Sequence, residues 1–476
     1  MDASLMPADS ERRNVSSFVI ATTVLTVLIA VCFLLAVRNP LLPLVLPVGL
    51  IGGLAFVAML GRTNGPFTIL LFAPYVMLQG GDSVSASELV YAGVLVVTLA
   101  IWYGDRLTRG EFILTTRGDT AFATFIFLLF PLVSVVALIL GAEPRIWVSD
   151  VFAALHFMLY FPVKQECAKG RDRMLLAVGA LVIGVVAGAF LNFIELANDL
   201  SVATRTWEIS SLRISDFDAH FVVVSLVLLS LMAVVRRRHI FPLACLFVIT
   251  FGALILTKSR AFWVVFLLGS FILFLGFSGK RRLRLASVIL GGSSLVIGVL
   301  VLFFRDYLFL FVAGVLFRIQ SIDQGIGDIS LRNRVVESVA VLKLVKLSPV
   351  IGYGPGTTYR YLDIIEWISD DDNFVHNGYV MLLYKYGVVG FLLMMRFWFV
   401  RIAEGWRAVR KAQNLDPVSA AVLLGCVAAM IGLLFSAMTS TPFMQNDKVW
   451  LVGMITGIVG GTSQRLHARI GGVGAE

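Results

Sequence analysis

Long apolar runs recur from one end of this sequence to the other. Most measure roughly 17–24 residues, about the length a helix needs to cross a bilayer. Lipid offers the backbone no hydrogen-bond partner, so such runs must be helical, and they are too long for the strands of a membrane barrel. With 58% hydrophobic and only 14% charged residues among 476, the chain cannot be a soluble globular protein. We therefore predict an all-α polytopic membrane protein with about 12–14 transmembrane helices.

The apolar runs predict roughly fourteen membrane spans. They cover residues 17–37, 41–60, 66–79, 88–102, 120–140, 151–163, 174–196, 219–235, 240–257, 261–278, 285–304, 378–400, 417–439 and 449–460. The runs at 66–79 and 151–163 are short and could be tilted, interfacial or re-entrant. The run at 17–37 exceeds the core of a signal peptide and lacks a clear small-residue cleavage site, which predicts a retained helix.

Basic residues determine the predicted topology. The formal net charge of +9 is carried by clusters at 12–13, 106–109, 164–173, 236–238, 280–284, 401–411 and 465–469. With fourteen spans, all these clusters fall on one side, the positive-inside pattern, which predicts that both termini are cytoplasmic. Any one of these clusters could instead bind nucleic acid or anionic lipid. Because the topology already explains all the clusters, we expect no nucleic-acid partner.

The remaining connections, at 198–218, 258–260, 305–376 and 440–448, then face the periplasm or the cell exterior. The longest of them divides the chain into N-terminal transmembrane helices (1–304), a large, partly helical periplasmic loop (305–377) and C-terminal helices with a cytoplasmic tail (378–476). Residues 333–347 have the pattern of an amphipathic interfacial helix, which Pro349 ends. A second helix should begin close to His376 and Asn377 and continue into the membrane.

Arginines at the external surface are candidates for binding a diphosphate. Arg260 follows Ser259 in a short external turn, and Arg332 and Arg334 stand at the start of the loop helix. The guanidinium group is always charged and presents a rigid fork of donors that matches phosphate oxygens. The alternative for each arginine is interfacial snorkelling or an ion pair with a nearby aspartate.

His376 is the only histidine predicted in the long loop. An imidazole with a pKa of about 6.5 can take a proton from a sugar hydroxyl. The alternative is a helix-cap or interfacial histidine, and Asn377 offers a second polar anchor beside it. Arg213, before the span at 219–235, and Arg318, within the loop, are candidate accessory residues; Arg213 could equally belong only to the helix entrance.

Other polar features carry weaker predictions. The three aspartates at 370–372 could hold a divalent cation, but a solvated loop tip is the more common reading. Gly352, Gly354 and Gly356 lack the flanking strand and helix of a nucleotide-binding turn, so a plain turn is expected. The four cysteines fall in spans or cytoplasmic connections and the five histidines are scattered, so neither a disulfide framework nor a zinc site is expected. Few charged residues lie near the middle of a span, which argues against an ion-coupled transporter.

Residues 257–390 resemble the O-antigen ligase and polymerase superfamily of integral-membrane glycosyltransferases. The matching elements are Ser259-Arg260, Arg334, Pro349 with the residues 351–356, the residues 376–379 and the Gly387-Val388-Val389-Gly390 sequence. Residues 213–220 follow the family's upstream pattern only loosely, which leaves a role for Arg213 or His220 in doubt. Arg332 could replace Arg334, because the two are close in sequence.

The resemblance implies a metal-independent and cofactor-independent transfer of a glycan from an undecaprenyl-diphosphate carrier to a sugar hydroxyl, on the outer face of the bacterial inner membrane. Arg260 and Arg334 would bind the diphosphate, His376 would be the general base, and the anomeric carbon would invert. The partners implied are the lipid-linked donor, a glycan or glycolipid acceptor, the bilayer and polysaccharide assembly proteins. The length and span count favour a polymerase over a ligase. The alternatives are a transporter or flippase of lipid-linked sugars and a non-catalytic scaffold of an export complex.

Overall fold

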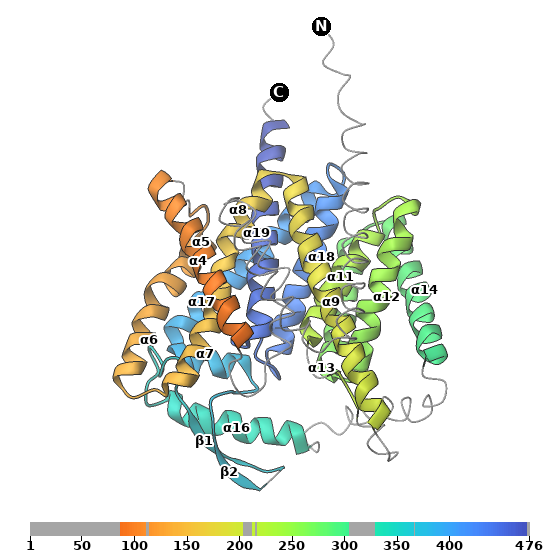
Figure 1. Ribbon diagram of the computed structural model, residues 1–476. Coiled ribbons are helices and arrows are strands. Elements are labelled where there is room, and N and C mark those ends of the chain that lie inside the picture. The colour runs from red at the N-terminus through yellow and green to blue at the C-terminus, as the bar shows by residue number, and fades with distance from the viewer. Residues whose placement is uncertain are drawn as a thin grey trace.

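The computed structural model describes residues 86–110, 114–202, 212–214, 217–303, 329–365 and 367–473. The spans expected at 17–37, 41–60 and 66–79, Cys32 and the accessory candidate Arg318 lie outside these residues. The described part of the chain is overwhelmingly helical (Figure 1), which confirms the prediction of an all-α polytopic membrane protein.

Six helical stretches in the described residues are long and apolar enough to cross a membrane. They are Arg117–Ile139 (α5, η1 and α6), Pro144–Lys169 (α7, η2 and α8), Arg171–Val202 (α9), Arg237–Leu256 (η3 and α12), Gly378–Ala412 (α17) and Pro417–Ser436 (α18). Two shorter apolar helices are Asp218–Met232 (α11) and Arg260–Gly276 (α13). Ala86–Arg109 (α4), Lys280–Phe303 (α14) and Asn446–Val473 (α19) complete the bundle. The short span expected at 151–163 lies within a stretch of 26 residues, so it has the length to cross a bilayer directly.

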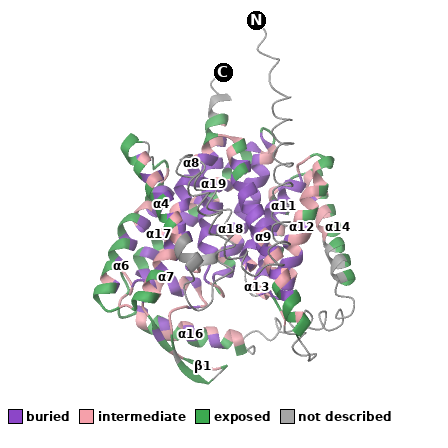
Figure 2. Cartoon of the chain, in the orientation of Figure 1, coloured by how far each residue is buried: buried purple, intermediate pink, exposed green. Residues whose placement is uncertain are grey.

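The centre of the bundle is formed by α11, α18 and α19, which Figure 2 shows as its most continuously buried part. Every residue of α11 from Ala219 to Met232 is buried, as expected for a helix that is apolar on all sides. Small residues on α19 allow α8 to approach closely: a Cβ added at Gly457 would lie 2.7 Å from Val163, and one at Gly461 would lie 2.1 Å from the carbonyl of Lys164.

The basic segments lie together at one end of the bundle. Arg284 contacts the carbonyl of Val235, and Gln413 Nε2 donates to the carbonyl of Gly276 at 2.6 Å, so the ends of α11, α13, α14 and α17 meet. Arg465 Nη2 donates to Ser419 Oγ at 2.6 Å and brings α19 and α18 to the same end. Residues 329–365 and 367–377 of the long loop lie at the opposite end of the bundle (Figure 1).

A buried ionic cluster joins three helices near the basic end. Lys164 Nζ lies 2.6 Å from Asp119 Oδ2, and Arg401 Nη1 lies 3.8 Å from Asp119 Oδ1. Arg401 also pairs with Glu404 at 2.8 Å. These charged residues lie just beyond the ends of the predicted spans, so they pair with one another near the end of the bundle and not in the middle of a span.

The described part of the long loop, residues 329–365 and 367–377, contains one helix and one hairpin. Helix α16 spans Ile329–Val345, so it begins four residues before the predicted start at 333 and ends before Pro349. Strand β1 (Tyr359–Asp363) pairs antiparallel with β2 (Ile368–Asp372), with Tyr359 opposite Asp372. The aspartates at 370–372 thus belong to a strand, where a solvated loop tip was expected. The alternation of Tyr359 and Tyr361 was the available strand signal.

Candidate functional site

The turn at His376 begins α17. Asn377 is the N-cap of this helix: its Oδ1 accepts hydrogen bonds from the backbone amides of Tyr379 at 3.1 Å and Val380 at 3.2 Å. The amide of Gly378 lies 2.8 Å from the carbonyl of Ala437 and 3.0 Å from that of Ser440. Asn377 therefore caps α17, and the hydrogen bonds of Gly378 fix the turn to the end of α18.

Glu337 on α16 contacts His376 at three points. Its Oε2 accepts from the backbone amide of His376 at 3.1 Å, and the ring Nδ1 lies 3.1 Å from Oε1 and 3.2 Å from Oε2. The carboxylate is only 1% exposed, whereas the imidazole is 40% exposed. One edge of the ring is therefore anchored on a buried group while the ring remains open to solvent.

Tyr359 links the hairpin to the same carboxylate. Its hydroxyl lies 2.8 Å from Glu337 Oε1 and 2.7 Å from the carbonyl of Phe374, and its single hydrogen is shared between these two acceptors. Burial and the neighbouring Glu337 carboxylate raise the pKa of the Tyr359 hydroxyl, so it stays protonated and remains a donor. Three elements, α16, β1 and the start of α17, thus meet at one carboxylate.

Arg334 lies one helical turn before Glu337. Its Nη1 donates to the carbonyl of Thr439 at 3.0 Å. Two residues further on, the hydroxyl of Thr441 donates to the carbonyl of Val375 at 3.2 Å. The connection between α18 and α19 therefore holds both Arg334 and the His376 turn, which brings these two predicted site residues together.

The start of α13, where Arg260 is the first helical residue, reaches the same connection. Lys448 provides the link: its Nζ lies 3.4 Å from Ser440 Oγ and 5.6 Å from the ring centroid of Phe262. It also lies 3.6 Å from Asp218 Oδ1 at the start of α11. Lys448 is only 7% exposed, so a buried ammonium group stands between the start of α13 and the connection that Arg334 contacts.

Two other predicted residues are placed differently. Arg332 is exposed, whereas Arg334, two positions along the same helix, is partly buried against Thr439, so the structure favours Arg334 over its alternative. Arg213 has an exposed side chain. Its neighbour Ile214 donates a backbone hydrogen bond to Leu256 at 3.1 Å, which places this segment beside the turn that leads to Arg260.

Three residues at the site were missed as functional candidates: Glu337, Tyr359 and Lys448. A partial signal existed for Glu337, because it follows Arg334 by three positions and residues at this spacing share a helix face. Tyr359 offered only its place in an alternating segment. For Lys448 the sequence carried no signal beyond its position in an external connection.

The aspartates of β2 do not converge. Asp372 Oδ1 accepts from the backbone amide of Phe374 at 2.9 Å, while Asp371 lies 3.9 Å from Arg360 Nε on β1. Neighbouring residues of a strand point to opposite faces, so these two carboxylates diverge. Within the part of the chain that the structure describes, no group of three or more His, Cys, Asp or Glu side chains is arranged to hold a metal ion.

The glycine-rich turn docks into a break in α17. Gly387 has φ +62° and ψ −170° inside the helix. Around this break, Tyr353 and Gly354 donate backbone hydrogen bonds to Tyr384 and Lys385 at 2.9 and 2.8 Å. In return, Val388 and Val389 donate to Pro349 and Val350 at 2.8 and 3.1 Å.

The three glycines of this turn are required by its shape and packing. Gly352, Gly354 and Gly356 all have positive φ, and a Cβ added at Gly352 would lie 2.6 Å from the carbonyl of Tyr384. Asp150 holds the end of the turn, since its Oδ2 accepts from the amide of Gly356 at 2.8 Å and from Lys385 Nζ at 3.1 Å. The glycines therefore let the turn pack closely against α17 at Gly352, α6 at Gly354 and α7 at Gly356.

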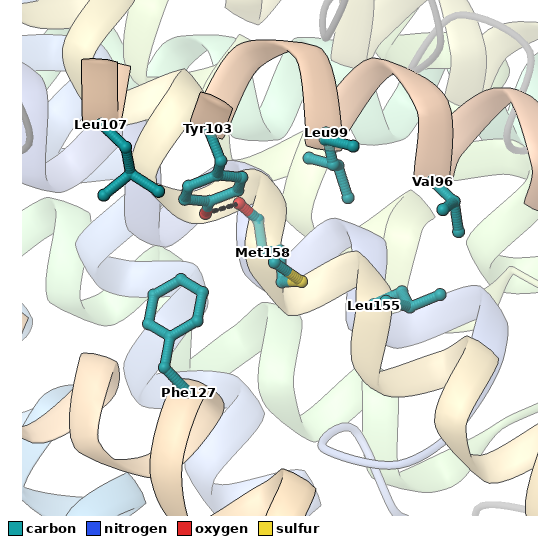
Figure 3. Close-up of a pocket in the computed structure, with 8 residues that line it drawn as sticks. Val96, Leu99, Tyr103, Leu107, Phe127, Leu155 and Met158 are labelled. Atoms are coloured by element: carbon teal, nitrogen blue, oxygen red, sulfur yellow. Dashed lines mark hydrogen bonds between the residues drawn. The ribbon is translucent and has the colours of Figure 1, made fainter. Parts of the chain in front are cut away.

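An apolar pocket of about 320 Å³ lies elsewhere, between α4, η1 and the α7–η2 segment (Figure 3). It is lined by Val96, Leu99, Ala100, Tyr103, Leu107, Phe127, Leu155 and Met158. The hydroxyl of Tyr103 is already bonded to the carbonyl of Met158 at 2.7 Å. The pocket shares no residue with the site around His376 and offers no group for acid–base chemistry.

Comparison with known proteins gives a family match over part of the chain. Residues 245–395 match the family model described as O-antigen ligase, which confirms the resemblance drawn from the sequence. The matched range contains α13, α16, the hairpin and the first part of α17, and with them Arg260, Arg334, Glu337 and His376. No curated protein matches this chain at a significant level.

Proposed function

The chain is a multi-pass bacterial membrane protein that carries an O-antigen ligase domain, and from this premise we propose that it transfers a glycan from an undecaprenyl-diphosphate carrier to a sugar hydroxyl. The observation that carries the proposal is the meeting of Arg334 and the His376 turn on the connection between α18 and α19. The start of α13, with Arg260, reaches the same connection through Lys448.

The cationic groups bind the leaving group in this proposal. Arg334 and Arg260 contact the diphosphate oxygens, and Lys448 adds a third positive charge. The bond between the anomeric carbon and the diphosphate breaks as negative charge grows on the bridging oxygen, and fixed cations stabilise that charge most where water is excluded. The diphosphate is already a good leaving group, so the reaction requires no acid to protonate it.

His376 acts on the other partner of the reaction. It takes the proton of the acceptor hydroxyl while the oxygen attacks the anomeric carbon from the face opposite the diphosphate. One carbon–oxygen bond forms, the other breaks, the electron pair leaves with the diphosphate and the proton remains on the imidazole. A single displacement of this kind inverts the anomeric carbon.

The proposed location is the bacterial inner membrane. The end of the bundle that carries the basic segments lies in the cytoplasm by the positive-inside rule, with both termini. The loop at 305–377, with α16 and the hairpin, forms the catalytic part and faces the periplasm, between the transmembrane helices of 1–304 and those of 378–476. A polymerase, which extends a lipid-linked polysaccharide, is favoured over a ligase that moves the finished glycan to another lipid.

The test is product formation by purified protein in lipid vesicles, with a lipid-diphosphate oligosaccharide as donor. We expect Arg260→Ala and Arg334→Ala to lower turnover about 100-fold or more, and His376→Ala to lower it by about 10²–10⁴-fold. Arg360→Ala is the matched control, because Arg360 is an exposed arginine on β1 of the same loop.

The outcomes separate the candidate functions. Lengthened carrier-linked glycan in the absence of a lipid A-core acceptor supports the polymerase, and product formed only with that acceptor supports the ligase. Unchanged glycan assembly by the folded His376→Ala protein would reject the enzyme. In that case a loss of lipid-linked sugar translocation after changes inside the bundle would identify a flippase, and tolerance of both arginine changes would indicate a scaffold.

A further inference from the structure

We infer that Glu337 is the positioning residue for His376, and that it selects Nε2 of the ring as the atom that takes the proton from the acceptor hydroxyl. The inference rests on the proposed function and adds to it a residue and an atom.

Hydrogen-bond chemistry fixes the tautomer. An ionised carboxylate can only accept hydrogen bonds, and both oxygens of Glu337 lie within 3.2 Å of Nδ1. In the neutral ring, Nδ1 therefore carries the hydrogen and the lone pair is on Nε2. The backbone amide of the same residue also donates to Glu337, at 3.1 Å, so the carboxylate orients the ring and its backbone together.

The Glu337 carboxylate also stabilises the protonated form of the His376 ring. When Nε2 accepts a proton, the imidazole becomes a cation in direct contact with a buried negative charge. Attraction between charges is stronger away from water, so the carboxylate stabilises the imidazolium as it forms. Among the residues that the structure describes, His376 is the only basic group within ion-pair distance of Glu337. A carboxylate that is 1% exposed is costly to bury unless hydrogen-bond donors surround it, and His376 supplies two of them, its backbone amide and its ring Nδ1.

Glu337 is itself held in place before any substrate binds. The Tyr359 hydroxyl donates to its Oε1 at 2.8 Å and also contacts the carbonyl of Phe374, two residues before His376. One turn earlier on the same face of α16, Asn333 Nδ2 donates to Asp363 Oδ2 at 3.0 Å and Asn333 Oδ1 accepts from the amide of Ile364, also at 3.0 Å. The loop helix is thus fastened to the hairpin at Glu337 and one turn before it, which is the arrangement expected of a preorganised support.

The experiment compares Glu337→Gln, His376→Ala and the double variant in vesicles. Glutamine keeps the size of the side chain but replaces one acceptor oxygen with an amide donor, which favours the wrong tautomer of the ring. We expect Glu337→Gln to lower kcat by about 10–10⁴-fold while the KM for the lipid-linked donor stays within about twofold. The double variant should be no slower than His376→Ala alone, because both changes remove the same function.

A spectroscopic readout tests the tautomer directly. The ¹⁵N chemical shifts of His376 should report a protonated Nδ1 in the wild type and a loss of that preference in Glu337→Gln. Asp371→Asn is the control, since it removes an exposed carboxylate from the same loop, and it should keep the wild-type kcat. Should Glu337→Gln fail to fold, Glu337→Asp replaces it in the experiment, because it keeps the charge on a side chain that is one methylene shorter. We expect its kcat to lie between those of the wild type and His376→Ala.

The outcomes distinguish this inference from the function it rests on. A wild-type kcat for folded Glu337→Gln, or losses that multiply in the double variant, would overturn the role of Glu337 while leaving the enzyme intact. A wild-type kcat for His376→Ala would instead overturn the proposed function. A lower kcat with an unchanged KM in Glu337→Gln, and no further loss in the double variant, would establish that Glu337 acts through His376.

Discussion

Arg334 donates a hydrogen bond from Nη1 to the carbonyl oxygen of Thr439 at 3.0 Å, across 105 positions of the sequence. This contact joins the loop helix α16 to the connection between α18 and α19. The guanidinium group is oriented by a backbone acceptor, so its position is set by the fold and not by the substrate.

The two arginines of α16 should differ sharply. We expect Arg334→Ala to lower kcat/KM for the lipid-linked donor about 100-fold or more, because it removes a fixed cation at the site. Arg332→Ala should change kcat/KM by less than about threefold, since its side chain is exposed and surface charges contribute little. Steady-state kinetics of the two folded variants provide the measurement, and equal losses would contradict the assignment of Arg334.

Lys448 should contribute to donor binding. Lys448→Met keeps the packing against Phe262 but removes the ammonium group, so we expect the KM for the donor to rise about tenfold, equivalent to about 1.4 kcal/mol. Lys343→Met, at an exposed lysine of α16, is the matched control. Initial rates over a range of donor concentrations give the KM of each variant. An unchanged KM in Lys448→Met would show that Lys448 does not contribute to binding the diphosphate.

Gly387 should be intolerant of a side chain. Its φ of +62° is strained for alanine, and the added Cβ would lie 2.2 Å from the carbonyl oxygen of Val350. We expect Gly387→Ala to destabilise the protein by about 1–3 kcal/mol or more and to expose residues 349–354 to protease. Gly93→Ala is the control, because Gly93 lies in α4 with no atom within 4 Å of the added Cβ. Thermal unfolding and limited proteolysis test this, and a wild-type melting temperature for Gly387→Ala would contradict it.

Asp372 should make the hairpin sensitive to pH. Burial, with a contribution from the charge of Glu337, raises the pKa of the Asp372 carboxyl above its ordinary value. The folded hairpin therefore favours the protonated form. Below the ordinary carboxyl pKa, Asp372 is protonated in both the folded and the unfolded protein and does not affect the stability of the hairpin. As the pH rises from there through the pKa of the folded state, the unfolded state ionises first and the hairpin loses stability.

Asp372→Asn should consequently stabilise the hairpin at pH 7.5. Asparagine keeps the acceptor for the amide of Phe374 while removing the charge. Hydrogen exchange of the strand amides should be slower than in the wild type at neutral pH, and the difference should vanish as the pH falls below the ordinary carboxyl pKa. A difference that persists or grows in acid would show the opposite sign of linkage. Asp371→Asn, on the opposite face of the strand, controls for charge removal alone.

Local features were the ones that the sequence could predict. The apolar runs revealed the helices, the amphipathic pattern revealed most of α16, and the start of α17 was expected within a residue or two of its position after Asn377. Each of these is determined by residues a few positions apart, where periodicity and capping operate. The pairing of Arg334 with the His376 turn was suggested only by the resemblance to a known family.

Features made by distant segments could not be predicted in this way. Nothing in the spacing of Glu337 and His376 indicates that they meet, because their approach depends on how α16 docks on the hairpin and on α17. The hairpin itself was hidden by three consecutive aspartates, a residue type that is depleted in strands. The full length of the helix around 151–163 was hidden because its ends carry polar residues.

The break at Gly387 has a consequence for how the molecule can move. Four backbone hydrogen bonds tie residues 349–354 to α17 around the break, in place of bonds that a regular helix would make with itself. Peeling this segment away would leave those amides and carbonyls without partners beside an apolar bundle, at several kcal/mol for each unsatisfied group. Separation of the two segments at this junction is therefore costly, so a tilt of α17 would move the glycine-rich segment together with the helix.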